Sequence, residues 1–142
     1  MIEVPTFDDA TILVVEDTQM MRVLMTRYLK QAGYTDVIES TNGQEALEVL
    51  KEKHIDLILL DINMPVLDGY QTLETIRADE TLKEVPVIMI TAVDAIESVA
   101  RCIEMGAEDY MPKLFNPILL KSRILACLEK RFWKRKALEL DG

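Results

Sequence analysis

Three short apolar runs in this chain do not alternate with polar residues, and they constrain its fold more than any other feature. Thr11–Val15, Ile55–Leu60 and Val87–Thr91 carry aliphatic side chains along most of their length. Strands of this kind are buried on both faces, as in a parallel sheet that helices cover on both sides. The runs therefore predict an α/β fold with three layers.

Between the apolar runs, apolar residues recur at the spacing of amphipathic helices, and Gly, Pro and Asn-Gly mark the breaks. Parallel strands joined by such helices form right-handed crossovers, which gives a helix–sheet–helix sandwich. The predicted strands are Thr11–Val15, Asp36–Glu39, Ile55–Leu60, Val87–Thr91 and Asp109–Met111. The predicted helices are Thr18–Ala32, Gln44–Lys53, Gly69–Ala78, Asp94–Met105 and a last one from Pro117 onward.

The chain of 142 residues has the length of one domain with a sizeable core. We divide it into an N-terminal lead at 1–10, a domain at 11–131 and a helical extension at 132–142, interpreted as a linker to an output domain. Lys130–Lys136 is basic and contains aromatic residues, which is typical of the solvated face of a helix and, less often, of a nucleic-acid patch.

Composition narrows the class of partner and the compartment. A formal net charge of −9 argues against direct binding of nucleic acid or an anionic membrane by this domain. No apolar run reaches the roughly 18 residues of a membrane span, and the start lacks the features of a signal peptide. Cys102 and Cys127 form no metal-binding spacing, so we expect reduced thiols in a cytoplasmic protein.

Polar residues stand where the predicted strands end. Glu16 and Asp17 follow the first strand, Asp61 stands at the end of the third, Thr91 ends the fourth, and Lys113 follows the fifth. Each one alone is more often a helix cap, a strand residue or a surface lysine. In an open parallel sheet, however, the ligand crevice lies beyond the carboxyl ends of the strands, so all five are expected to converge there.

Three carboxylates in one crevice repel one another, and a divalent cation removes that repulsion. An all-oxygen ligand set without His or Cys favours Mg²⁺ over zinc. A hydrated Mg²⁺ ion recruits phosphate, to which Lys113 adds a charge and Thr91 a hydroxyl donor. With Asp61 at the centre, the pattern predicts attack of a carboxylate oxygen on phosphorus, which forms an aspartyl phosphate.

Four segments carry a family resemblance: "ILVVEDTQMMR", "DLILLDINMPVLDGYQ", "PVIMITA" and "GAEDYMPKLFNP". In this order they resemble the response-regulator receiver domain of two-component signalling, over a match from about Thr11 to about Arg131. The resemblance implies a CheY-like, flavodoxin-like fold whose five parallel strands lie in the order 2-1-3-4-5, with five helices.

The resemblance also implies roles for individual residues. Asp61 would be the phosphoacceptor. The Mg²⁺ ligands would be Asp17 and Asp61, Glu16 through a bound water, and the backbone carbonyl of Asn63. The phosphoryl-binding and switch residues would be Thr91, Ala92, Lys113 and Tyr110. The chain would catalyse its own phosphorylation and autodephosphorylation and no other reaction.

The implied partners follow from the family. A sensor histidine kinase or a phosphotransfer protein would supply the phosphoryl group. The fourth helix, fifth strand and fifth helix would form a surface for homodimerisation or for a C-terminal output domain of the cyclase or phosphatase type.

One residue departs from the family pattern. Lys113 is followed by Leu114, where most receivers have a proline joined by a cis peptide bond. A cis bond before leucine costs about 2.5–4 kcal/mol, against about 0.5–1 before proline, so a trans bond is expected. The departure leaves room for a degenerate receiver that acts only as an interaction module. A haloacid-dehalogenase-like phosphohydrolase is the other alternative, but its acidic pair would come last in the chain.

Overall fold

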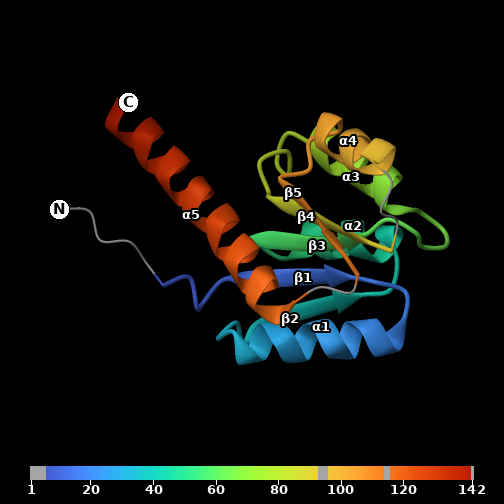
Figure 1. Cartoon of the computed structure of the whole chain (residues 1–142). Helices are drawn as coiled ribbons and strands as arrows, with labels where there is room; N and C mark the ends of the chain where they lie inside the picture. The colour runs from blue at the N-terminus through green and yellow to red at the C-terminus, as the bar shows by residue number, and fades with distance from the viewer. Residues whose placement is uncertain (1–5, 93–95, 114–115, 142) are drawn as a thin grey trace.

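The computed structural model describes residues 6–92, 96–113 and 116–141, in which five strands and five helices alternate (Figure 1). In chain order they are β1 (Thr11–Val15), α1 (Gln19–Gln31), β2 (Asp36–Ser40), α2 (Gly43–Glu52), β3 (Leu57–Asp61), α3 (Gly69–Ala78), β4 (Val87–Thr91), α4 (Ile96–Glu104), β5 (Asp109–Pro112) and α5 (Pro117–Asp141). All ten elements lie where the sequence predicts them, with small shifts at their ends, and the predicted start of the fourth helix at Asp94 lies outside the described residues.

The strands form one sheet in the order β2-β1-β3-β4-β5, and every neighbouring pair is parallel. This order confirms the predicted fold class. The register aligns the carboxyl ends of the strands, because Val15 pairs with Leu60, Asp61 with Ile90 and Thr91 with Pro112. Residues that follow β1, β3, β4 and β5 therefore meet at one edge of the sheet.

Successive residues of each central strand enter different hydrophobic cores, which explains why the strands are apolar throughout. In β1, Ile12 and Val14 belong to a core with residues of α1 and α5, whereas Leu13 and Val15 belong to a core with residues of α2, α3 and α4. Figure 1 shows the same division, with α1 and α5 on one side of the sheet and the other helices opposite. Burial on both faces makes the sheet a rigid base for the residues at its edge.

Helix α5 continues without a break through the predicted extension and projects past the ends where the strands begin (Figure 1). The first part of the extension contacts both the N-terminal lead and the domain. Its Phe132 ring meets Phe7 edge to face, with centroids 6.1 Å apart, and Lys134 pairs with Glu84 at 3.3 Å. The division of the chain at residue 131 stays a prediction. Among the described residues, no helix combines the length and apolar character that crossing a membrane requires.

Candidate functional site

The predicted acidic cluster forms at the carboxyl edge of the sheet. Glu16 and Asp17 directly follow β1, and Asp61 is the last residue of β3. Each residue offers one carboxylate oxygen, and these oxygens lie within 4.8 Å of one another. Glu16 and Asp61 are almost fully buried, with 0% and 1% of their surface exposed, whereas Asp17 is exposed. The cluster is therefore sunk into the sheet on one side and open to solvent on the other.

The Asp61 carboxylate is buried without full compensation. Neither oxygen of this carboxylate, nor the Oε2 atom of Glu16, accepts a hydrogen bond from the described residues. Burial, and then the charge of Glu16, raise the pKa of Asp61 to about 7, although Lys113 opposes the shift. Because an unpaired buried carboxylate costs several kcal/mol, roughly, this arrangement favours a ligand that brings positive charge.

Lys113 supplies one positive charge to the cluster. Its Nζ atom lies 3.2 Å from Oδ2 of Asp61 and 3.3 Å from Oε1 of Glu16. Its backbone N–H donates to the carbonyl of Thr91 at 2.9 Å, which extends the pairing of β4 with β5 and fixes the lysine at the edge. Burial lowers the pKa of Lys113, but the charges of Asp61 and Glu16 outweigh it and the pKa is raised. The ammonium group therefore stays charged.

The main chain of the β3–α3 loop approaches Asp61 closely at Gly69. The Gly69 N–H donates to the carbonyl of Ile62 at 2.8 Å, and a Cβ atom at this position would lie 2.3 Å from the carbonyl oxygen of Asp61. Asp68 caps α3 by a reciprocal capping box with Gln71. The start of α3 is thus set directly against the end of β3, and only glycine fits at the contact.

The other predicted site residues lie around the cluster. Thr91 is fully buried at the end of β4, and Ala92 after it is exposed. Tyr110, on β5, is partly buried and packs against the core beneath α2, α3 and α4. Asn63 follows β3 by two residues and is exposed. Leu114, which replaces the proline of most receivers, lies outside the described residues. The predicted trans peptide bond before it therefore also lies outside the described part of the chain.

One contact of the site was not predicted from the sequence. Arg22, in the first turns of α1, donates from Nη1 to the carbonyl of Glu16 at 2.8 Å and to that of Asp17 at 3.0 Å. Its Nε atom lies 3.5 Å from Oε1 of Glu39 in β2. The only signal in the sequence is the position of Arg22 at the end of the "VVEDTQMMR" segment. Its bonds to main-chain carbonyls follow from the fold.

The donor set fits a hard divalent cation. Three carboxylates converge, three of their buried oxygens accept no hydrogen bond from the described residues, and the exposed side gives room for water ligands. Mg²⁺ prefers oxygen ligands and keeps several waters, so the buried and exposed halves of this cluster suit it. Nothing in the cluster offers the nitrogen or sulfur ligands that zinc prefers.

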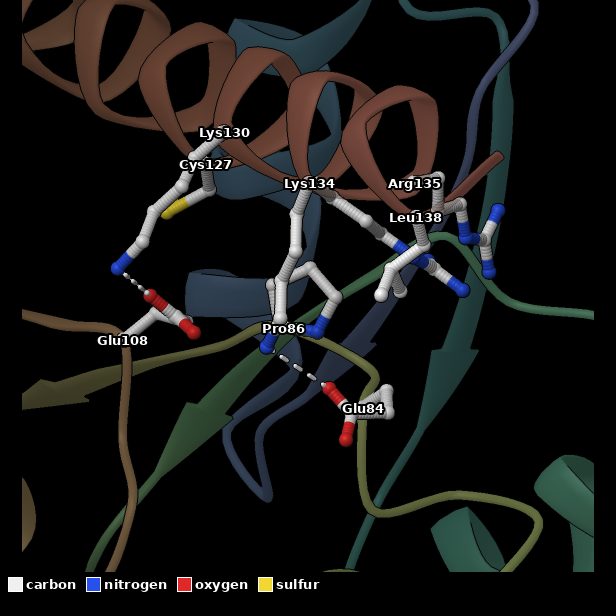
Figure 2. Close-up of a pocket in the computed structure, with 9 residues that line it drawn as sticks. Glu84, Pro86, Glu108, Cys127, Lys130, Lys134, Arg135 and Leu138 are labelled. Atoms are coloured by element: carbon white, nitrogen blue, oxygen red, sulfur yellow. Dashed lines mark hydrogen bonds and ion pairs between the residues drawn. The ribbon is translucent and has the colours of Figure 1, made fainter. Parts of the chain in front are cut away.

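A separate cavity of about 340 Å³ lies under α5, at the edge of the sheet where the strands begin (Figure 2). Pro86 before β4, Glu108 before β5, Cys127 and Leu138 contribute to its lining, and the ion pairs Lys130–Glu108 and Lys134–Glu84 tie the helix across it. It shares no residue with the acidic cluster.

Comparison with known proteins agrees with this geometry. The family model for the response regulator receiver domain matches residues 12–125. A probable transcriptional regulator, ycf27, from Porphyridium aerugineum is 38% identical over 119 residues, which are 84% of this chain and 48% of that relative. The chain therefore spans about half the length of such curated relatives. Chemotaxis protein CheY-3 from Vibrio cholerae is 35% identical over 84% of this chain and 92% of its own length.

Solved structures show the same fold. Chemotaxis response regulator CheY4 of Vibrio cholerae superposes with a TM-score of 0.78 at 30% identity, covering 84% of this chain and 99% of that one. The receiver domain of sensor histidine kinase PA1611 from Pseudomonas aeruginosa, which holds a magnesium ion in its active-site cleft, has a TM-score of 0.78 and 31% identity over 84% and 98% of the two chains. The chain belongs to the response regulator receiver domain family of two-component signalling.

Proposed function

We propose that Asp61 is the phosphoacceptor of this receiver domain and that it takes its phosphoryl group from a phosphohistidine of a sensor kinase or phosphotransfer protein. The observation that supports this most strongly is the state of the Asp61 carboxylate. It is buried at the end of β3, its Oδ1 atom has no hydrogen-bond donor among the described residues, and Lys113 lies 3.2 Å from Oδ2. A purely structural carboxylate at this depth would be fully hydrogen-bonded.

The proposed cation is Mg²⁺. Asp17 and Asp61 would be direct ligands, Glu16 would act through a water molecule, and the backbone carbonyl of Asn63 would complete the protein ligands. The magnesium-bound receiver of PA1611, similar to this chain over most of its length, supports the same choice. When bound, the ion neutralises the charge of the acidic cluster and of the incoming phosphoryl oxygens.

The transfer itself needs little from the protein beyond position and charge. A carboxylate oxygen of Asp61 attacks phosphorus and forms the new O–P bond while the N–P bond of the phosphohistidine breaks. The electron pair of that bond returns to the imidazole nitrogen, which then takes up a proton from solvent. Lys113 pairs with the phosphoryl oxygens. The phosphoryl group thus becomes a third anionic partner of Lys113, beside Asp61 and Glu16.

The proposed signal is a change of surface on α4, β5 and α5. Phosphorylation adds about two negative charges beside Thr91 and Ala92. Movement of Thr91 toward the phosphoryl group would leave space into which Tyr110 turns. Ile103 on α4 and Ile118 and Leu119 on α5 are exposed apolar side chains on these elements, and they support a role of this surface in pairing with a second copy or an output domain.

The phosphoacceptor is tested with acetyl phosphate as a small-molecule donor. The chain is incubated with acetyl phosphate and Mg²⁺, and its intact mass is measured over time. We expect the mass of one phosphoryl group to be added to the wild type and not to Asp61→Asn. Two controls are included. The wild type without Mg²⁺ should not be labelled, and Asp56→Asn, which removes a carboxylate at the other end of β3, should be labelled like the wild type. Equal labelling of Asp61→Asn would refute the assignment.

The surface is tested separately. Size-exclusion chromatography before and after addition of beryllofluoride and Mg²⁺ reports the oligomeric state. A larger apparent mass that reverts in Ile118→Glu would support pairing through α4, β5 and α5. An unchanged mass would count against a homodimer formed by the chain alone.

A further inference from the structure

We propose that Arg22 is a positioning residue of the metal site, which holds the Glu16–Asp17 segment in the conformation that binds a divalent cation. The inference rests on the proposed function, because it assumes that the acidic cluster binds Mg²⁺. In this role Arg22 would not contact the metal ion itself. It would act through the main chain of Glu16 and Asp17, whose side chains are the proposed metal ligands.

The contacts of Arg22 are directed at the backbone of this segment. One nitrogen, Nη1, bridges two consecutive carbonyls, at 2.8 Å to Glu16 and 3.0 Å to Asp17. The guanidinium is itself held from a third side, since Nε lies 3.5 Å from the Glu39 carboxylate on β2. Only 15% of the Arg22 side chain is exposed. It therefore links β1, β2 and α1 at the point where the metal ligands emerge.

Asp17 depends on this link more than Glu16 does. The Glu16 carboxylate accepts from the N–H of Thr18 at 3.2 Å and pairs with Lys113, and the Glu16 N–H donates to Ser40 at 3.1 Å. The Asp17 carboxylate is exposed and makes no hydrogen bond or ion pair with any residue that the structure describes. The position of Asp17 is therefore set by its main chain, and Arg22 binds the carbonyl of that main chain.

An electrostatic role and a positioning role predict changes of opposite sign. If Arg22 acted only through its charge, its removal would leave the cluster more negative and Mg²⁺ would bind more tightly. If it positions Asp17 and Glu16, its removal frees their main-chain torsions and Mg²⁺ binds more weakly. Groups that orient metal ligands typically contribute 10- to 100-fold in metal affinity.

The experiment measures the dissociation constant of Mg²⁺ by isothermal titration calorimetry on the full chain. Arg22→Ala is compared with the wild type and with Arg27→Ala, which makes the same change of charge at an exposed position of the same helix. We expect Arg22→Ala to weaken Mg²⁺ binding about tenfold or more, and Arg27→Ala to leave it unchanged or slightly tighter. Glu39→Gln, which keeps both carbonyl bonds, should remain close to the wild type.

Arg22→Lys keeps the charge but replaces the bridging guanidinium by a single ammonium. It should recover part of the lost affinity, and it replaces Arg22→Ala as the test if circular dichroism shows that the alanine variant does not fold. A second readout is the rate of labelling by acetyl phosphate. At saturating Mg²⁺ the rate of the Arg22 variants should return toward that of the wild type, because the defect lies in metal binding.

Mg²⁺ binding by Arg22→Ala or Arg22→Lys that equals or exceeds that of Arg27→Ala would overturn the inference. Failure of the wild type to bind Mg²⁺ would instead overturn the proposed function. The two failures are therefore distinguishable in one titration series.

Discussion

At the scale of single residues, Asp61 carries two opposing demands. It is buried at the end of β3, and to serve as a ligand of the proposed Mg²⁺ it would have to be ionised. Burial and the neighbouring Glu16 raise its pKa to about 7, so near neutral pH a proton would compete with the proposed metal ion for the same carboxylate.

This competition predicts a pH dependence of Mg²⁺ binding. The apparent affinity should fall as the pH drops below about 7, by roughly tenfold per pH unit if one proton is displaced. Calorimetric titrations between pH 5.5 and 8.5 check this. Affinity that is independent of pH across that window would contradict it.

The same shift has a consequence for stability without metal. The folded chain keeps a proton on Asp61 at pH values between 3.8 and about 7, where the unfolded chain has lost it. The contribution of Asp61 to the free energy of unfolding therefore falls as the pH rises through this range. Asp61→Asn should remove this pH dependence. The free energy of unfolding of the variant, minus that of the wild type, should therefore be larger at pH 8 than at pH 5. Denaturant melts in EDTA at the two pH values measure this difference.

Val66 shows local strain in the loop beside the site. It adopts a φ of +70°, its side chain is 80% exposed, and Leu67 N–H donates to the carbonyl of Pro65 across it at 2.8 Å. A β-branched residue in this left-handed turn is unfavourable. Val66→Asn should therefore raise stability by about 1 kcal/mol, measured by urea melts. Val23→Asn, at an exposed position of α1, is the control, and equal effects would exclude relief of strain.

At the scale of elements, the contact between β3 and α3 depends on the absence of a side chain at Gly69. An alanine Cβ would lie 2.3 Å from the Asp61 carbonyl and 2.6 Å from the Ile62 Cα, so main-chain atoms would have to move. Gly69→Ala should cost about 1–3 kcal/mol and also weaken Mg²⁺ binding, because the displaced atoms carry Asp61.

Gly33→Ala provides a matched comparison. Gly33 has a φ of +103° just after α1, and a Cβ atom there would meet nothing closer than Oδ1 of Asp8 at 3.5 Å, an ordinary van der Waals distance. This variant should lose stability through backbone strain and keep its metal affinity. Thermal melts and Mg²⁺ titrations of both variants separate the two effects, and equal Mg²⁺ affinities would contradict the role given to Gly69.

Helix α5 raises the question of where the domain ends. Beyond Arg131 its contacts with the body include the edge-to-face pair of Phe132 with Phe7 and the exposed ion pair of Lys134 with Glu84. An aromatic pair contributes about 0.5–1.5 kcal/mol and an exposed ion pair little. A chain ending at Arg131 should therefore unfold cooperatively with a modest loss of stability. Loss of the cooperative transition in calorimetry would place the extension inside the domain.

At the scale of the whole molecule, the proposed binding of Mg²⁺ by the acidic cluster would make stability depend on the metal. The chain carries a formal net charge of −9, and three of its carboxylates meet at one edge of the sheet. A ligand that binds only the folded state stabilises it by about 2.7 kcal/mol at 100 times its dissociation constant. We expect Mg²⁺ to raise the melting temperature by several degrees, EDTA to reverse this, and Asp17→Asn to lose most of the shift. A rise of the same size in Asp17→Asn would contradict the proposed ligand set.

The sequence by itself determined the class of fold, the order of the elements and most of the residues that meet in the candidate site. Strands buried on both faces must be apolar throughout, and helices that cover a sheet must be amphipathic. The local pattern of apolar residues therefore already predicts the three-layer fold. Glu16, Asp17, Asp61 and Lys113 could be named because their chemistry is unusual at the ends of apolar strands. Only the tertiary structure decided which ion pairs and hydrogen bonds balance the charges of these groups.

The register of strands far apart in the chain sets the distances from Lys113 to Asp61 and Glu16. It also decides which carboxylate oxygens are left without a hydrogen-bond donor. Arg22 could not be assigned a role from the sequence, because its partners are main-chain carbonyls, which every residue has. A carbonyl becomes a specific partner only when the fold brings a donor to it. The residue types thus indicated the chemistry of the site, and the packing of β1, β2 and α1 decided which side chain reaches the main chain of Glu16 and Asp17.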